Sequence, residues 1–169
     1  MSRVHSFPPV ADERAEILIL GSMPGKVSLQ ASQYYAHPRN LFWHFMDEIL
    51  GIPREAPYAE RCEVLKANGV ALWDTLQSCA RPGSLDANIE DATAVPNDFK
   101  AFLSTHPNIR LIGFNGAKAE SVFTKKVVPD LDRSLHRIGL QRLPSTSPAN
   151  ASIPRKVKLT EWRRLLSAL

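Results

Sequence analysis

The stretch Ala15-Glu16-Ile17-Leu18-Ile19-Leu20-Gly21 decides the fold of this 169-residue chain. An aliphatic run that ends at a glycine predicts a short strand buried on both faces and followed by a turn. A second run at residues 109–114 ends in the same way, at Asn115-Gly116. The two runs therefore predict neighbouring strands of one sheet, each with a turn at its carboxyl end.

Weaker apolar runs at residues 70–73 and 140–143 are also predicted strands. Between the strands, apolar residues recur at helical spacing, which predicts helices at residues 40–50, 59–68, 97–104, 116–127 and 160–169. Strands that alternate with helices predict an α/β fold, a three-layer αβα arrangement with a short, mainly parallel central sheet flanked by helices. We expect residues 1–169 to form a single domain, because this length fits one.

Composition narrows the class of protein. The formal net charge of +4 permits a polyanionic partner without requiring one. Two cysteines, Cys62 and Cys79, predict reduced thiols, since they are too few for a four-cysteine iron–sulfur cluster or a secreted disulfide framework. The histidines do not show the spacing of metal ligands, so no metal site is expected. No apolar run approaches the ~20 residues of a membrane span and no signal peptide is visible, which predicts a soluble, cytoplasmic protein.

In open α/β sheets, ligands bind in the crevice at the carboxyl ends of the strands. Three segments follow predicted strands and are rich in Gly, Pro, Ser or Asn: residues 21–28, 115–116 and 144–150. We therefore expect these three segments to form the binding site.

Each segment has a structural alternative to a functional interpretation. Gly21-Ser22-Met23-Pro24-Gly25 lacks the spacing of a Walker loop, and no helix is predicted to open after Lys26, so a rigid turn is favoured in isolation. In the segment 34–43, Asn40 alone would be a helix cap and His37 a hydrogen-bonded structural residue. Asn115 is typical of an Asn-Gly turn, although its amide could also read the edge of a base.

The last segment, residues 145–152, is either a plain polar loop or a source of hydroxyl and N–H groups for phosphates. Arg155, Lys156 and Lys158 follow it and add positive charge, for which a solvated helix face is the usual explanation.

Taken in order, these segments resemble the uracil-DNA glycosylase superfamily over about residues 16–165. The resemblance is greatest to the hypoxanthine-DNA (deoxyinosine) glycosylase branch, with similarity to the mismatch-specific uracil/thymine glycosylases. The most specific residues are Gly-Ser-Met-Pro-Gly at 21–25 and Tyr-Tyr-Ala-His-Pro-Arg-Asn-Leu-Phe-Trp at 34–43. Weaker matches follow at residues 71–74, 83–86 and 147–150.

This resemblance implies a monofunctional DNA glycosylase that hydrolyses the N-glycosidic bond of hypoxanthine or uracil in damaged single- or double-stranded DNA, as a step of base-excision repair. It implies a monomer without metal or organic cofactor, and no lyase step, because no lysine stands at a matching position. Asn40 is the expected catalytic residue. Tyr35 is expected to stack on the extruded base and Asn115 to read its edge. The other expected substrate-binding residues are Gly21, Ser22, Met23, Pro24, Gly25 and His37, and the expected DNA-binding residues are Ser145, Ser147, Asn150, Arg155 and Lys156.

Two departures from the pattern keep alternatives open. Mismatch-type relatives carry Asn where this chain has Met23, and the large wedge residue of the third motif is missing after Ser147-Pro148-Ala149. The alternatives are a mismatch-specific uracil/thymine glycosylase, a lesion-binding module without catalysis, and an enzyme that acts on a free nucleoside or nucleotide.

Overall fold

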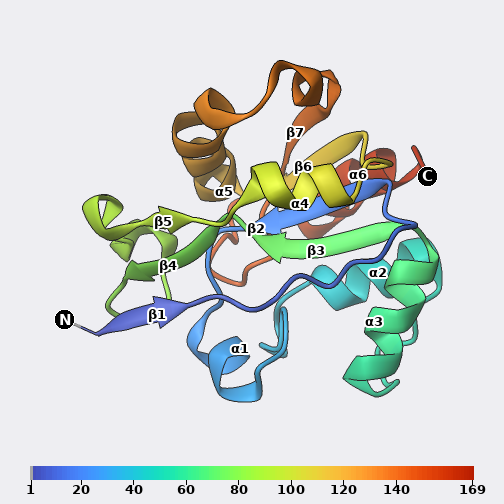
Figure 1. The fold of residues 1–169 in the computed structure, drawn as a ribbon. Helices are drawn as coiled ribbons and strands as arrows, with labels where there is room; N and C mark the ends of the chain where they lie inside the picture. Colours follow the sequence, from blue (N-terminus) through green and yellow to red (C-terminus); the bar gives the residue numbers. More distant parts are fainter. Residues whose placement is uncertain (1) are drawn as a thin grey trace.

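The computed structural model describes residues 2–169 and has a central sheet of four parallel strands in the order β3-β2-β6-β7 (Figure 1). The strands are β2 (Ile17–Gly21), β3 (Val70–Asp74), β6 (Leu111–Asn115) and β7 (Gly139–Leu143). Ile17 of β2 aligns with Val70 on one side and Leu111 on the other. All four predicted strands are confirmed, and their carboxyl ends meet at one edge of the sheet.

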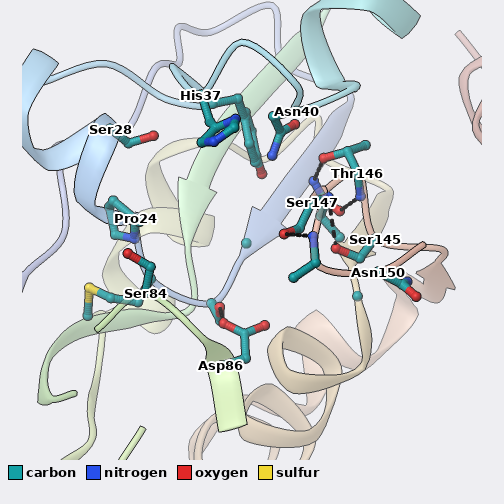
Figure 2. A pocket seen from close by; sticks show the side chains of 18 of the residues that line it. Pro24, Ser28, His37, Asn40, Ser84, Asp86, Ser145, Thr146, Ser147 and Asn150 are labelled. Carbon is teal, nitrogen blue, oxygen red and sulfur yellow. Dashed lines mark hydrogen bonds between the residues drawn. The ribbon is translucent and has the colours of Figure 1, made fainter. Parts of the chain in front are cut away.

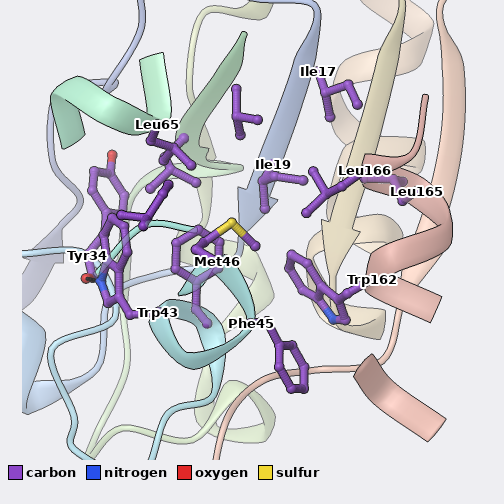
Figure 3. Close-up of a cluster of buried hydrophobic side chains, with 14 of the residues drawn as sticks. Ile17, Ile19, Tyr34, Trp43, Phe45, Met46, Leu65, Trp162, Leu165 and Leu166 are labelled. Atoms are coloured by element: carbon purple, nitrogen blue, oxygen red, sulfur yellow. Dashed lines mark hydrogen bonds between the residues drawn. The ribbon is translucent and has the colours of Figure 1, made fainter. Parts of the chain in front are cut away.

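Successive side chains of β2 point to opposite faces, as the strand period requires. Ile17 and Ile19 join a cluster with α2 (Phe42–Leu50), α3 (Tyr58–Ala67) and α6 (Arg155–Leu166), part of which is drawn in Figure 3. Leu18 and Leu20 join a second cluster with α4 (Phe99–Thr105) and α5 (Ala117–Val122). Helices therefore cover both faces, and the predicted three-layer αβα architecture is confirmed.

A second, antiparallel sheet of three strands was not predicted. It consists of β1 (Arg3–His5), β4 (Leu76–Ala80) and β5 (Val95–Pro96), in the order β1-β4-β5. A single residue, the fully buried Thr75, separates β4 from β3, so this sheet extends from the carboxyl edge of the central one. The following loop contains two short 3₁₀ turns, η1 (Asp86–Asn88) and η2 (Asp91–Thr93).

Two predictions about helices are wrong. A helix does open after Gly25: α1 (Lys26–Ala31) has only six residues, too few to show an apolar period. Helix α6 begins at Arg155 rather than at residue 160, directly after Pro154 at its N-cap.

The remaining predicted helices are present with shifted ends. The predicted helix at 116–127 is α5 followed by a π-helical turn, η3 (Phe123–Val127), and the 3₁₀ turns η4 (Val128–Asp130) and η5 (Arg133–Arg137) come next. Cys62 and Cys79 are buried free thiols, as predicted. Among residues 2–169, no helix combines the length and apolar character that crossing a membrane requires.

Candidate functional site

A cavity of about 950 Å³ opens at the carboxyl edge of the central sheet (Figure 2). The three segments expected from the strand ends all line it. Its walls include every residue predicted for the site except Arg155 and Lys156, namely Gly21, Ser22, Met23, Pro24, Gly25, Tyr35, His37, Asn40, Asn115, Ser145, Ser147 and Asn150. The volume lies within the usual range for small-molecule sites.

The loop at residues 21–25 turns its carbonyl groups away from free solution. The Gly21 carbonyl accepts a hydrogen bond from the Thr75 N–H at 2.7 Å, and the Pro24 carbonyl accepts one from Nη2 of the buried Arg81, also at 2.7 Å. Within residues 2–169, the N–H groups of Met23 and Gly25 have no acceptor. Such a loop can offer N–H groups to a ligand that carries negative charge.

The Met23 side chain belongs to a small core. It is buried with Leu76, Cys79 and Ile89 beside the antiparallel sheet. A thioether in an apolar cluster cannot orient a water molecule, so the side chain of Met23 anchors the loop and only its backbone can serve a ligand.

Asn40 uses one side of its amide to begin helix α2. Its Oδ1 accepts a hydrogen bond from the Phe42 N–H at 3.0 Å, although the N-cap position of the helix is Leu41 and not Asn40, the cap of the structural alternative. Because a backbone N–H requires an acceptor, this contact fixes the oxygen toward Phe42 and leaves the Nδ2 donors free. The amide can therefore accept from the first N–H of the helix and still donate a hydrogen bond to a molecule in the cavity.

Tyr35 has a strained backbone and an unpaired hydroxyl. Its φ of 56° lies in the left-handed region, which is uncommon for a residue other than glycine. Phe42 stacks on its ring with centroids 4.3 Å apart. The hydroxyl is buried without a partner among residues 2–169, and burial, followed by the charge of Asp74, raises the pKa of Tyr35.

The amide of Asn115 is largely occupied. Its Nδ2 donates to Thr146 Oγ1 and its Oδ1 accepts from the Thr146 N–H, both at 2.9 Å. The Thr146 carbonyl in turn accepts from the Leu41 N–H at 3.0 Å. These bonds tie the end of β6 to the loop at 144–150 and to the start of α2. Asn115 retains one N–H and spare acceptor capacity, so its reading of a base edge stays a prediction.

The family model of the Uracil DNA glycosylase superfamily matches residues 8–167, nearly the whole chain. The chain belongs to this superfamily. It is 36% identical over 159 residues to a hypoxanthine DNA glycosylase of Methanosarcina acetivorans, covering 92% of this chain and 93% of the relative. A hypoxanthine DNA glycosylase of Methanosarcina barkeri is 44% identical over 114 residues, which is 67% of this chain and 71% of that protein.

A solved structure supports the same membership. The solution NMR structure of a protein from Methanosarcina acetivorans, proposed to be a uracil DNA glycosylase, superimposes with a TM-score of 0.82 at 33% identity. The alignment covers 99% of this chain and 98% of that chain. The αβα fold described above is therefore shared with that Methanosarcina protein.

In the present protein, the loop at 145–150 is held by local hydrogen bonds. Ser145 Oγ accepts from the Ser147 N–H at 3.1 Å, and Ser147 Oγ accepts from the Ala149 N–H at 3.2 Å (Figure 2). Lys158, expected to add surface charge, is buried instead and donates to the carbonyl of Asn150. Lys158 therefore fixes the loop and does not contribute a solvated cation.

The two predicted DNA-binding residues outside the cavity lie at the start of α6. Arg155 forms an ion pair with Glu48 at 3.1 Å and lies over the ring of Phe45, while Lys156 is exposed. Of the cavity residues, His37 accepts a hydrogen bond from the Arg39 N–H at Nδ1, 3.1 Å away. That bond leaves its Nε2 as the atom that can meet a ligand.

Sequence reasoning missed several residues of the cavity. Asp74, the last residue of β3, lies in its lining and is 3% exposed. The loop before η1 closes another side, because Ser22 Oγ donates to Asp86 at 2.5 Å and the Lys26 N–H donates to Ser84 Oγ at 2.9 Å. Between these two anchors, Leu85 lines the cavity and is 51% exposed. The segments 71–74 and 83–86 carried part of the family resemblance, which was the available signal, but no role was assigned within them.

Proposed function

We propose that this protein is a monofunctional DNA glycosylase that hydrolyses the N-glycosidic bond of a deaminated base, hypoxanthine or uracil, in DNA during base-excision repair. The main support is the juxtaposition of the free Asn40 donor with the unpaired N–H groups of Met23 and Gly25 around one cavity. The names of the two Methanosarcina relatives favour hypoxanthine.

The chemistry needs two charges to be stabilised at once. As the glycosidic bond breaks, positive charge develops on the sugar and negative charge on the leaving base. N–H groups of the 21–25 loop are suited to the base, and preorganised donors of this kind contribute much of the catalysis in enzymes. The Nδ2 group of Asn40 can donate a hydrogen bond to one lone pair of a water oxygen. The other lone pair of that water molecule is then free to attack the sugar carbon.

The substrate must first leave the DNA stack, at a cost of about a few kcal/mol that is least for a mispaired base. In the proposed complex the Tyr35 ring stacks on the extruded base and the serines of the 145–150 loop contact phosphates. The enzyme acts as a monomer without a metal or organic cofactor.

A lyase step would need a free amine near the sugar. Two lysines line the cavity, Lys26 and Lys118, and the ammonium group of Lys118 is held by Asp91 at 2.6 Å. Because neither stands at a position that matches a catalytic lysine of the family, we expect hydrolysis without a covalent enzyme–DNA intermediate, and borohydride should trap no protein–DNA adduct.

The test is base release from end-labelled duplexes that carry one deoxyinosine, one uracil or one mismatched thymine, followed by alkali. Strand cleavage that depends on alkali supports a monofunctional glycosylase and identifies its base. Preference for the thymine mismatch would replace the proposal by the mismatch-specific alternative. Lesion-selective binding without cleavage of any duplex would replace it by the binding module.

A further inference from the structure

Asp74 is a carboxylic acid in the wall of the cavity, and among residues 2–169 its buried Oδ2 has no hydrogen-bond partner. Asp74 ends β3 opposite Gly21 of β2, and its side chain is almost completely buried. Only its backbone is held, by a hydrogen bond of 2.7 Å from Asn97 Nδ2 to the Asp74 carbonyl.

The absence of a side chain at Gly21 leaves space for the Asp74 carboxyl group. A Cβ atom on Gly21 would lie 2.6 Å from Asp74 Oδ1 and 3.2 Å from the Tyr35 hydroxyl, so only glycine fits between them. The hydroxyl of Tyr35 is the other buried side-chain atom without a partner among the described residues. Two unsatisfied polar atoms at one point of a cavity wall indicate a ligand that supplies their partners.

Within the described part of the chain, residues 2–169, no ion pair compensates the charge of Asp74. The groups that face it from neighbouring elements are Asp86, Arg81, Tyr34 and Tyr35, and the guanidinium of Arg81 is occupied by the carbonyls of the 21–25 loop and of Gly83. The other basic residues that line the same cavity are Lys26, His37, Arg39 and Lys118, of which Lys118 is paired with Asp91. Burial first, and then the charge of Asp86, raise the pKa of Asp74 to about 7, against a smaller opposing effect of Arg81. Near neutral pH a large share of the molecules thus carries the neutral acid.

We propose that Asp74 is a further catalytic residue, which in its neutral form donates a proton to the base while the glycosidic bond breaks. This inference rests on the proposed glycosylase function and deepens it. A neutral acid kept as a donor by an apolar environment is a known catalytic device. A deaminated base suits it, because its ring carries a carbonyl oxygen and at least one further acceptor.

The C1′–N bond breaks heterolytically and its electron pair remains with the base. The proton of the Asp74 carboxyl moves to an acceptor oxygen or nitrogen of that base, which leaves neutral. Water adds to C1′ and releases its proton to solvent, and Asp74 takes a proton back from solvent after the base has departed.

The test is the single-turnover rate of hypoxanthine release from a deoxyinosine duplex between pH 5.5 and 8.5. The neutral fraction of Asp74 falls from about nine-tenths at pH 6 to about one-tenth at pH 8, so the wild-type rate should fall about tenfold. Asp74→Asn should be slower by about 10²-fold at pH 6, the low end for loss of a general acid, and should lose this pH dependence. The His37→Gln variant should keep it, which separates Asp74 from the cavity histidine. Asp132→Asn, an exposed change outside the cavity lining, is the matched control.

A rate that rises with pH, or an Asp74→Asn variant with wild-type rate and pH profile, would overturn the assignment. A second measurement does not depend on turnover: free hypoxanthine should bind the wild type about tenfold more weakly at pH 8 than at pH 6, and Asp74→Asn equally at both. Absence of base release by the wild type from any duplex would refute the proposed function. In that case hypoxanthine binding still decides, because absent or pH-independent binding contradicts a neutral donor at Asp74.

Discussion

Replacing Asp74 by asparagine should stabilise the protein in a way that depends on pH. In the folded state the pKa of Asp74 is raised to about 7 from an ordinary 3.8, so between these values the folded protein binds more protons than the unfolded chain. Wild-type stability contributed by this group is therefore greatest at low pH and falls as the pH rises toward 7. Asparagine cannot ionise, so the variant does not lose this stability as the pH rises.

The magnitude follows from the two pKa values. Because a tenfold change in an equilibrium is about 1.4 kcal/mol, the free-energy difference between Asp74→Asn and wild type should grow by about 2–3 kcal/mol from pH 5 to pH 8. Any cost of leaving the new amide without a partner is independent of pH and cancels in the comparison. In a chain of this length the same change corresponds to about 5–10 °C in melting temperature.

Urea unfolding of both proteins at pH 5, 6, 7 and 8 measures this difference. Asp132→Asn is again the control, because Asp132 is exposed and its variant should stay parallel to wild type. If the Asp74→Asn and wild-type curves are parallel across the range, Asp74 is not an unpaired buried acid, and the argument for its neutral form fails.

Three further predictions concern the walls of the cavity. Asn40→Asp keeps an acceptor for the Phe42 N–H but removes the donors, so stability should change little while base release falls by about 10²-fold or more in single-turnover assays. Equal activity would leave Asn40 only the structural role of ordering the start of α2. Leu85→Ala should slow base release from duplex DNA more than from single strands, because an exposed apolar side chain at the cavity can fill the gap left in the base stack. The control is Leu140→Ala, which changes a 47% exposed leucine outside this cavity. Equal rates of Leu85→Ala and wild type on duplexes would exclude Leu85 as a wedge. Arg81→Lys keeps the charge but loses the planar guanidinium group that donates to the Pro24 carbonyl, so base release should fall at unchanged DNA affinity. A wild-type rate would show that Arg81 does not position the 21–25 loop.

The central sheet could be predicted because its sequence signal is strong. The residues from Ile17 to Leu20 are completely buried, and a buried parallel strand appears as an uninterrupted apolar run. The antiparallel sheet could not be predicted, since β5 has two residues and β1 has three, lengths at which no alternation is visible. Helix α1 could not be predicted for a similar reason, because its six residues are too few to show an apolar period.

The location of the site was predictable, and the state of its side chains was not. The turns after β2, β6 and β7 must meet at one edge, so the three segments could be placed without coordinates. The occupation of the Asn115 amide depends on Thr146, which lies 31 residues away and pairs only in the fold. Asp74 ends a strand at the edge of the sheet, where an aspartate is ordinarily solvated, and the packing of Gly21 and Tyr35 against it buries it.

The polar groups of the cavity divide into two kinds, and this division explains how the site can be both rigid and reactive. The bonds of Asn115 to Thr146 and of Arg81 to Pro24 hold the walls, because each joins segments that are far apart in the sequence, and the local bond of Asn40 to Phe42 orders the start of α2. The groups left without partners, which include the Asp74 carboxyl and the Tyr35 hydroxyl, gather on the floor. Unsatisfied buried groups cost stability, and a bound base that satisfies them regains it, so the binding energy of the correct base is greatest where the fold has left its own polar atoms unpaired.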